Sequence, residues 1–418
     1  MKKTIIKKLV LSLLISFISI SLISCGTRTV QTDTAQENQI VNTPVTTTSQ
    51  TDQKSSHIQN QDPQDPNTAE ITPADSSKDK DIIINNAHKK RVKAKGLYLT
   101  ATSAGVRLQH YIDLANTTEI NSYVIDVKND YGNVCYDSSV PLAKEIGAID
   151  VRYDIDKVIK ELHDNDIYAI ARIVSFKDPV LAKSNPEFAI KNKDGELYVH
   201  NKMNWVNPYN KQAWQYNIDL AKEALAKGFD EVQFDYVRFP DGRKSEMVFG
   251  DTHGKKMYET INEYLAYARQ EMPDAILSAD VFAIIAESPG DTEGIGQYFE
   301  HIGKNMDYIY LMAYPSHYAL GQIINNVKFP KPDLDPYGVI KNTLLRAKER
   351  SSKVDGHTPV VRTYLQDFTA SWIGQGNYQK YEDKQIRQQI QAVYDAGYEE
   401  WILWDHMNSY REGAFEKN

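Results

Sequence analysis

The stretch GFDEVQFDYVRFP, residues 228–240, decides the fold. A helical pattern over Lys211–Lys227 precedes it, and Gly228 is a helix-stop signal. The apolar and aromatic residues that follow predict a strand over Glu231–Phe239. A helix that leads directly into a short buried strand is typical of parallel sheets with crossover helices.

Seven further runs of β-branched and aromatic residues lie on either side of this stretch, separated by helical patterns such as the one that begins at Asp154-Ile155-Asp156. Eight strand–helix units close a barrel, so the sequence predicts an α/β fold of the (β/α)₈ TIM-barrel class, over 91–418 as one domain. A doubly wound open sheet is the rival architecture, because periodicity alone does not distinguish the two. The eight predicted strands are Lys95–Ala101, Ser122–Lys128, Tyr168–Val174, Glu231–Phe239, Ile276–Phe282, Tyr308–Pro315, Val360–Phe368 and Glu400–His406.

The first 25 residues have the features of a lipoprotein signal peptide. Four lysines precede an apolar run over Leu9–Ile23, and a small residue, Ser24, stands directly before Cys25. This arrangement predicts cleavage before Cys25 and lipid attachment to it, with an ordinary signal peptide and an incidental cysteine as the alternative. With Cys25 lipidated, Cys135 is the one cysteine left, so the exported part has no intramolecular disulfide.

The segment 26–90 is rich in Thr, Gln, Asp, Ser, Asn and Pro and contains no aromatic residue. Such a composition cannot bury enough apolar surface to offset the entropy of ordering, which predicts a disordered tether. The expected location is therefore the outer face of the cell membrane, where a lipid on Cys25 anchors the chain.

The composition argues against several classes of partner and cofactor. The net charge is −8 and the chain has no basic patch after the signal peptide, which disfavours nucleic acid. No glycine-rich phosphate loop follows the first strand, no His/Cys/Asp cluster has metal-ligand spacing, and no Gly-x-Ser-x-Gly motif occurs. We therefore expect no cofactor and no metal. The 26 Tyr and 5 Trp are compatible with sugar-stacking surfaces, and equally with a tyrosine-rich core.

Active sites of TIM barrels lie at the carboxyl ends of the strands. Strand alternation places Gln233, Asp235 and Val237 on one face, expected to be the barrel interior, and Ser278 with Asp280 on the corresponding face of the next strand. Neighbouring strands are about 4.8 Å apart. This spacing matches the roughly 5–5.5 Å between the carboxyl groups of a retaining glycosidase. We predict Asp235 as the nucleophile or as a stabiliser of the transition state, and Asp280 as the acid/base, with barrel-mouth ion pairs as the alternative for both.

Other polar and aromatic residues near the strand ends are candidates for substrate binding. The charged ones are alternatively ion-pair partners of the catalytic carboxylates, and the aromatic ones are alternatively core material. The candidates are Asp126, Lys128, Arg172, Arg238, Tyr314, His317 and Trp404.

Several collinear motifs resemble a bacterial family known as the "putative glycosyl hydrolase domain". They are KGLYLT (95–100), VIDVK (124–128), ARIV (171–174), WVNP (205–208), GFDEVQFDYVRFP (228–240), SADVF (278–282) and YPSHY (314–318), and the resemblance spans about 93–410. It implies a TIM-barrel glycosidase. More distantly, the fourth strand resembles that of chitinase-like barrels, which end in Asp-x-Asp-x-Glu, but Gln233 and Val237 replace the outer two acids. Against amylase-like barrels, Asp235 matches the nucleophile, and Asp280 stands where those enzymes use Glu.

The expected function is thus a cell-surface glycoside hydrolase that acts on a wall or exported polysaccharide. A non-catalytic carbohydrate-binding or envelope-scaffold lipoprotein is the alternative, since a fold does not imply an activity. A transglycosylase or a deacylase-like enzyme is a weaker third hypothesis.

Overall fold

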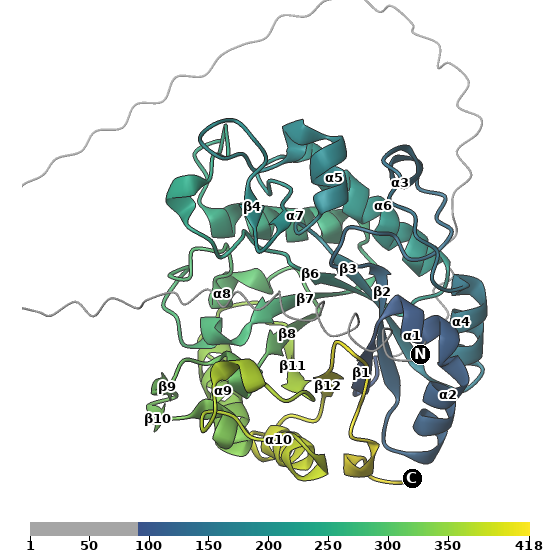
Figure 1. Cartoon of the computed structure of the whole chain (residues 1–418), viewed down its shortest axis with the longest axis vertical. Coiled ribbons are helices and arrows are strands. Elements are labelled where there is room, and N and C mark those ends of the chain that lie inside the picture. Colours follow the sequence, from purple (N-terminus) through teal and green to yellow (C-terminus); the bar gives the residue numbers. More distant parts are fainter. Residues whose placement is uncertain (1–90) are drawn as a thin grey trace, which may run out of the picture. The chain divides into compact units, whose positions relative to one another are not determined.

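The computed structural model describes residues 91–418 (Figure 1). The predicted signal peptide (1–25), its Cys25 and the predicted tether (26–90) lie outside the described residues. Within 91–418, no helix combines the length and the apolar character needed to cross a membrane.

Eight parallel strands form a closed barrel in the order β1-β12-β11-β8-β7-β6-β3-β2, with helices around it (Figure 1). This confirms the predicted (β/α)₈ class and excludes the open sheet. Each predicted strand is present, and the differences lie at the strand ends. The strands are β1 (Lys95–Leu99), β2 (Ser122–Lys128), β3 (Tyr168–Val174), β6 (Glu231–Asp235), β7 (Ile276–Phe282), β8 (Tyr308–Met312), β11 (Val360–Gln366) and β12 (Trp401–Trp404).

The helices pack against the outside of the barrel through apolar stripes. In α4, for example, the side chain of Asp154 accepts a hydrogen bond from the amide of Lys157 and caps the first turn, and the helix buries Ile155, Val158, Ile159 and Leu162. The helices are α1 (Ala101–Val106), α2 (Leu108–Thr117), α3 (Pro141–Glu145), α4 (Ile155–His163), α5 (Pro179–Ser184), α6 (Gln212–Ala226), α7 (Met257–Glu271), α8 (Phe299–Ile302), α9 (Pro336–Ser351) and α10 (Asp383–Asp395).

Two antiparallel hairpins lie in the long loops that follow strands at their carboxyl ends. The first, β4 (Val199–His200) with β5 (Met203–Asn204), follows β3, and the second, β9 (Gln322–Ile324) with β10 (Val327–Phe329), follows β8. Loops at this end of a TIM barrel carry the active site, so both hairpins stand on the functional face.

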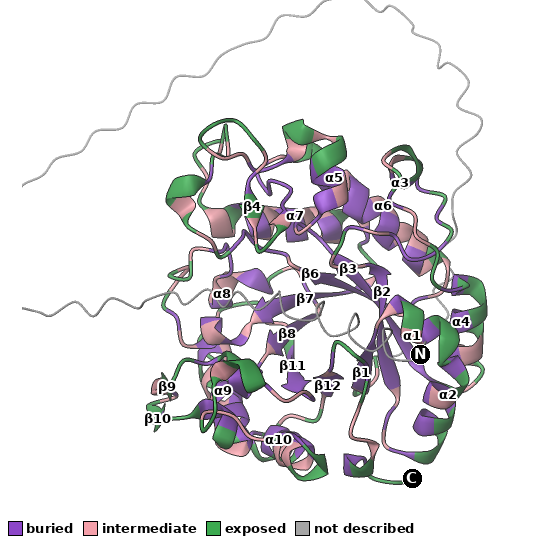
Figure 2. Ribbon diagram, in the orientation of Figure 1, coloured by how far each residue is buried: buried purple, intermediate pink, exposed green. Residues whose placement is uncertain are grey.

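The barrel strands are buried, as Figure 2 shows, and the barrel interior is polar as well as apolar. At the amino ends of the strands, Nη1 of Arg362 lies 2.7 Å from Oε2 of Glu231, and both side chains are fully buried. Ser278 and Tyr310 donate hydrogen bonds to the other oxygen of Glu231. Glu231 and Arg362 thus form a buried ion pair that links strands at the amino end of the barrel.

The fourth barrel strand is shorter than predicted. β6 ends at Asp235, and Tyr236 adopts a φ of +47°, a left-handed conformation that is uncommon for a bulky residue. This single residue breaks the strand alternation, so Val237 packs in the hydrophobic layer between the barrel and the helices. The prediction that Val237 shares the barrel interior with Gln233 and Asp235 was therefore wrong.

Candidate active site

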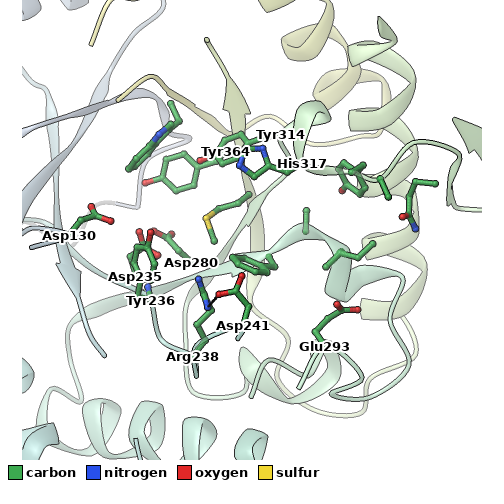
Figure 3. Close-up of a pocket in the computed structure, with 18 of the residues that line it drawn as sticks. Asp130, Asp235, Tyr236, Arg238, Asp241, Asp280, Glu293, Tyr314, His317 and Tyr364 are labelled. Atoms are coloured by element: carbon green, nitrogen blue, oxygen red, sulfur yellow. Dashed lines mark hydrogen bonds and ion pairs between the residues drawn. The ribbon is translucent and has the colours of Figure 1, made fainter. Parts of the chain in front are cut away.

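A cavity of about 580 Å³ opens at the carboxyl ends of the barrel strands (Figure 3). Five of its lining residues are acidic and two are arginines, and aromatic side chains form much of the remaining wall. The lining residues are Asp130, Arg172, Asp235, Tyr236, Arg238, Asp241, Asp280, Phe282, Ala283, Ile284, Glu293, Met312, Tyr314, His317, Tyr318, Ala319, Gln322, Tyr364 and Trp404.

Asp235, at the end of β6, is held in place by two neighbours. Nε and Nη2 of Arg172 lie 2.9 and 2.6 Å from its Oδ2. The backbone amide of Tyr236 donates to its Oδ1 at 2.5 Å, a contact that follows from the left-handed turn at Tyr236. Both oxygens are thus oriented, and the arginine supplies a positive countercharge for a carboxylate anion.

Arg172, on β3, is the cation that three carboxyl groups share. Besides Asp235, it donates to Oδ1 of Asp126 at 2.6 Å and to Oδ2 of Asp130 at 3.0 Å. Burial raises the pKa of Asp126 to about 6, against the opposing effect of Arg172. Although burial alone would raise it, the pKa of Asp130 lies well below its ordinary value, because the charges of Arg172 and Lys177 outweigh burial.

Asp280, on β7, contrasts with Asp235. Its side chain is almost fully buried, and neither carboxyl oxygen has a hydrogen-bond partner among the described residues. Burial raises its pKa well above the ordinary value, and the negative charge of Asp235 raises it further. Burial and the neighbouring Asp235 therefore both favour the protonated form of Asp280 in the cavity wall.

The two aspartates occupy matching places on neighbouring strands. Residues Gln233 and Phe234 of β6 pair with Ser278 and Ala279 of β7, so the next residue on each strand is one of the two aspartates. Figure 3 shows Asp235 and Asp280 side by side at the same end of the cavity. The site thus combines, within one cavity, a carboxyl group that is paired with an arginine and one that has no hydrogen-bond partner among the described residues.

Aromatic rings surround this pair. Trp404 stacks on Tyr98 with ring centroids 3.8 Å apart, and the guanidinium carbon of Arg172 lies 5.2 Å from the centroid of the Trp404 ring. Tyr314 and Tyr364 also line the cavity, and the ring centroid of Tyr364 lies 5.8 Å from that of Trp404. Burial raises the pKa of both tyrosines well above the ordinary value, with the negative charge of Asp280 as the next cause. Both phenols are therefore neutral hydrogen-bonding groups.

Arg238 and His317 line the cavity farther from the aspartates. The guanidinium carbon of Arg238 lies 4.4 Å from the centroid of the Phe282 ring, and its Nη1 lies 3.3 Å from Oδ1 of Asp241. Burial lowers the pKa of His317, so its imidazole is neutral at neutral pH. Neither residue touches the aspartate pair in Figure 3, which leaves them as candidate contacts for distal parts of a ligand.

Seven of the nine residues predicted for the site line the cavity: Asp235, Asp280, Arg172, Arg238, Tyr314, His317 and Trp404. Asp126 does not line it. It lies behind Arg172 and accepts a hydrogen bond from the hydroxyl of Tyr98 at 2.7 Å, so it acts on the cavity through those two residues.

Lys128 is also absent from the cavity wall, which argues against a direct contact with a ligand there. Its Nζ lies 2.8 Å from Oδ2 of Asp178 and 2.6 Å from Oδ1 of Asn217, and the side chain is fully buried. The register of β2 against β3 shifts between Asp126 and Lys128, so the simple alternation used for the prediction does not hold there.

Several lining residues were missed from the sequence. Tyr364 lies on the same face of its strand as Arg362 and Gln366, so strand alternation could have predicted that it faces the barrel interior. Asp130 lies in the loop that begins at the carboxyl end of β2, where a functional carboxylate is expected. Glu293 and Asp241 lie in loops, where the sequence gives no pattern that predicts a position. Within 91–418, no group of three or more His, Cys, Asp or Glu side chains is arranged to hold a metal ion.

The sequence pattern of the family described as "Putative glycosyl hydrolase domain" matches residues 96–410. Among curated proteins, no sequence matches the chain. A hypothetical protein from Ruminiclostridium thermocellum ATCC 27405 is similar to 44% of this chain and 97% of its own, with 53% identity and a TM-score of 0.43.

Two further solved structures are similar at low identity. The glycoside hydrolase domain of PgaB (BpsB) from Bordetella bronchiseptica aligns with 75% of this chain and 94% of its own, at 13% identity and a TM-score of 0.52. The spore cortex-lytic enzyme SleL from Bacillus megaterium QM B1551 aligns with 78% and 74%, at 12% identity and a TM-score of 0.44. The likeness to the PgaB domain supports the barrel fold.

Proposed function

The chain belongs to the "Putative glycosyl hydrolase domain" family, and from this membership we propose that it is a cell-surface glycoside hydrolase that cleaves a wall or exported polysaccharide with retention of configuration. The observation that carries the proposal is the contrast between two neighbouring carboxyl groups. Asp235 is paired with Arg172, and Asp280 is buried without a partner among the described residues. A retaining glycosidase needs one ionised and one protonated carboxyl group in the same cavity.

In the first step of the proposed reaction, Oδ1 or Oδ2 of Asp235 attacks the anomeric carbon. The bond from that carbon to the leaving oxygen breaks, and Asp280 donates its proton to this oxygen. The products are a covalent glycosyl ester on Asp235 and a free hydroxyl on the departing sugar. Arg172 stabilises Asp235 before the attack, and its geometry presents the carboxylate in one orientation.

In the second step, the ionised Asp280 accepts a proton from water, and the water oxygen attacks the anomeric carbon. The ester bond to Asp235 breaks, which releases the sugar and restores both carboxyl groups to their starting states. A mechanism assisted by an acetamido group, as the chitinase pattern would suggest, lacks its proton donor here, because the corresponding residue is Val237 in the hydrophobic layer.

The test is hydrolysis of wall and exopolysaccharide fractions by the full-length chain, beside its Asp235→Asn variant. Val360→Ala is a control, since Val360 is a partly exposed residue at the amino end of β11. Release of reducing ends by the parent and by Val360→Ala, but not by Asp235→Asn, supports the proposal. Saturable binding of a polysaccharide without release by any variant would favour the carbohydrate-binding alternative instead.

The stereochemical outcome needs a separate measurement. Proton NMR during the first minutes of hydrolysis shows which anomer is released before mutarotation. We expect the anomer of the substrate. Initial release of the opposite anomer would mean that water attacks directly, with Asp235 as a general base and not as a nucleophile.

We also propose that the chain is an exported lipoprotein, in which 26–90 tethers the barrel to a lipid on Cys25. The residues that support this proposal are the basic start, the apolar run Leu9–Ile23 and Ser24-Cys25. Expression of the full-length chain and its Cys25→Ser variant, followed by fractionation, provides the test. The parent is expected in membranes and labelled by a radioactive fatty acid, and an unlabelled parent would contradict the anchor.

A further inference from the structure

Trp372 is an exposed aromatic residue on the functional face of the barrel. It lies in a short 3-10 turn, Ser371–Ile373, in the loop between β11 and α10, and 66% of its surface is exposed. Trp205, Trp214 and Trp401 are buried and Trp404 is half-buried. A single exposed side chain needs no ligand to explain it, so the surroundings of Trp372 decide whether it binds one.

A line of rings connects Trp372 to the cavity. Trp372 stacks on Phe368 with centroids 5.7 Å apart and an angle of 22° between the rings. Phe368 in turn lies 5.7 Å from the ring of Tyr314 and 6.1 Å from that of His317, both of which line the cavity. The aromatic wall beside the two aspartates therefore continues across the rim, without interruption, to Trp372.

Hydrogen bonds hold the part of the loop that directly follows Trp372. The side chain of Asn377 donates to the carbonyl of Ile373 at 3.1 Å, and Nζ of Lys331 donates to the carbonyl of Gly376 at 2.8 Å. Gly374, directly after the turn, has a φ of +91°, which glycine adopts without strain. Since these contacts fix the loop before a ligand arrives, little conformational entropy is lost on binding.

We propose that Trp372 is a remote sugar-binding subsite, which one sugar ring of a polysaccharide occupies while the bond to be cleaved lies between Asp235 and Asp280. The apolar face of a pyranose ring covers the open face of the indole, and the hydroxyl groups at its edge remain in water. The substrate is thus a polymer that spans from the aspartates across Phe368 to Trp372. This inference rests on the proposed glycosidase function.

The first test compares a polymer with a short substrate. The substrates are the polysaccharide fraction that the parent hydrolyses and an aryl glycoside of its sugar, which is too small to reach Trp372. For Trp372→Ala, the ratio of kcat/KM on the polymer to kcat/KM on the aryl glycoside is expected to fall about tenfold, chiefly through KM. Trp372→Phe keeps an aromatic face and should recover most of this ratio, and Val360→Ala should match the parent.

A second test does not depend on turnover. In the Asp235→Asn background, acrylamide quenches the fluorescence of the exposed Trp372 more strongly than that of the buried tryptophans. The polysaccharide is expected to protect the Trp372 fluorescence from acrylamide quenching. A disaccharide from the same polymer is expected to give no such protection. Removal of the protected signal by Trp372→Phe assigns it to this residue.

The outcomes separate the two hypotheses. If the parent hydrolyses no fraction, or if Asp235→Asn retains full activity, the proposed glycosidase function fails and the subsite falls with it. Only the subsite proposal is overturned if the parent hydrolyses a polymer and two further results hold. These are an unchanged ratio of kcat/KM values in Trp372→Ala, and no protection of Trp372 from acrylamide by the polymer. Protection by lipid vesicles or by a protein, but not by the polymer, would also overturn it.

Discussion

The guanidinium of Arg172 contacts one carboxylate oxygen of Asp235 through two nitrogens, Nε at 2.9 Å and Nη2 at 2.6 Å. Asp280 stands at the matching place on the neighbouring strand and receives no hydrogen bond from any residue of 91–418. The structure thus places two adjacent and chemically identical groups in different surroundings, one paired with an arginine and one buried without a hydrogen bond. The difference depends on which of them the buried arginine reaches.

Replacement of Arg172 by Met is expected to destabilise the fold strongly. The substitution leaves Asp126 and Asp235 buried without the cation that they share, and breaking one side of a buried ion pair costs about 3–5 kcal/mol. Urea unfolding measures the loss. The control is Arg243→Met, which breaks an exposed pair with Glu246 and should cost less than about 1 kcal/mol. Similar losses in the two variants would contradict the central role of Arg172.

Replacement of Asp235 and of Asp280 by Asn is expected to lower activity in different ways on different substrates. Asp280→Asn removes the proton donor, which should lower kcat/KM on the polysaccharide by about 10²–10⁴-fold. On a dinitrophenyl glycoside, whose leaving group needs no proton, the first step is largely spared, and single-turnover release of dinitrophenol measures this. Asp235→Asn removes the nucleophile and should cost about 10⁴-fold or more on both substrates. Equal losses for Asp280→Asn on both substrates would contradict its role as the acid.

The contribution of Asp280 to stability is expected to decrease as the pH rises. Its pKa in the folded protein is raised well above the ordinary value of 3.8. At a pH between the ordinary and the raised pKa, the folded state therefore holds a proton that the unfolded state releases. The stabilising contribution is therefore complete below about pH 4 and is lost as the pH rises through the folded pKa. Asp126, with a pKa of about 6, and Asp367, at about 7, contribute in the same direction.

Asp280→Asn isolates the contribution of Asp280. The amide cannot ionise, so the variant should match the parent near pH 4 and exceed its free energy of unfolding by more than about 1 kcal/mol at pH 8. Urea unfolding at a series of pH values measures the difference. A constant difference over this range would mean that Asp280 does not change its charge on unfolding.

The fold was predictable because the same strand–helix sequence pattern occurs eight times. Each barrel strand is a short apolar run between helical patterns, and errors at individual ends, such as the one at Phe239, leave the count of eight unchanged. The aspartate pair was predictable for a related reason. Asp235 and Asp280 both lie within the regular part of their strands, where alternation fixes the direction of a side chain.

The remaining differences arise where the backbone departs from regular geometry. The left-handed turn falls on Tyr236, an aromatic residue that carries none of the usual glycine or asparagine signal, so the sequence alone does not predict the strand end. Trp372 was missed because its loop is ordered by contacts with distant residues such as Lys331. Such contacts are absent from any local pattern.

Lys128 provides a direct test of the difference between a predicted and an observed role. As a substrate-binding residue it should affect KM, whereas its buried pair with Asp178 predicts an effect on stability. Lys128→Met leaves the Asp178 carboxylate buried without its cation, so we expect a loss of about 3–5 kcal/mol in the free energy of unfolding and no change in KM for the polysaccharide.

The matched control for this prediction is the double variant Lys128→Met/Asp178→Asn. It removes both charges, and Asn can still accept the hydrogen bond from the amide of Leu181 that caps α5, so part of the lost stability should return. Steady-state kinetics and urea unfolding on the two variants and the parent provide the comparison. A rise in KM without a loss of stability in Lys128→Met would support the predicted role of Lys128 in substrate binding. It would contradict the assignment of Lys128 as a buried structural cation.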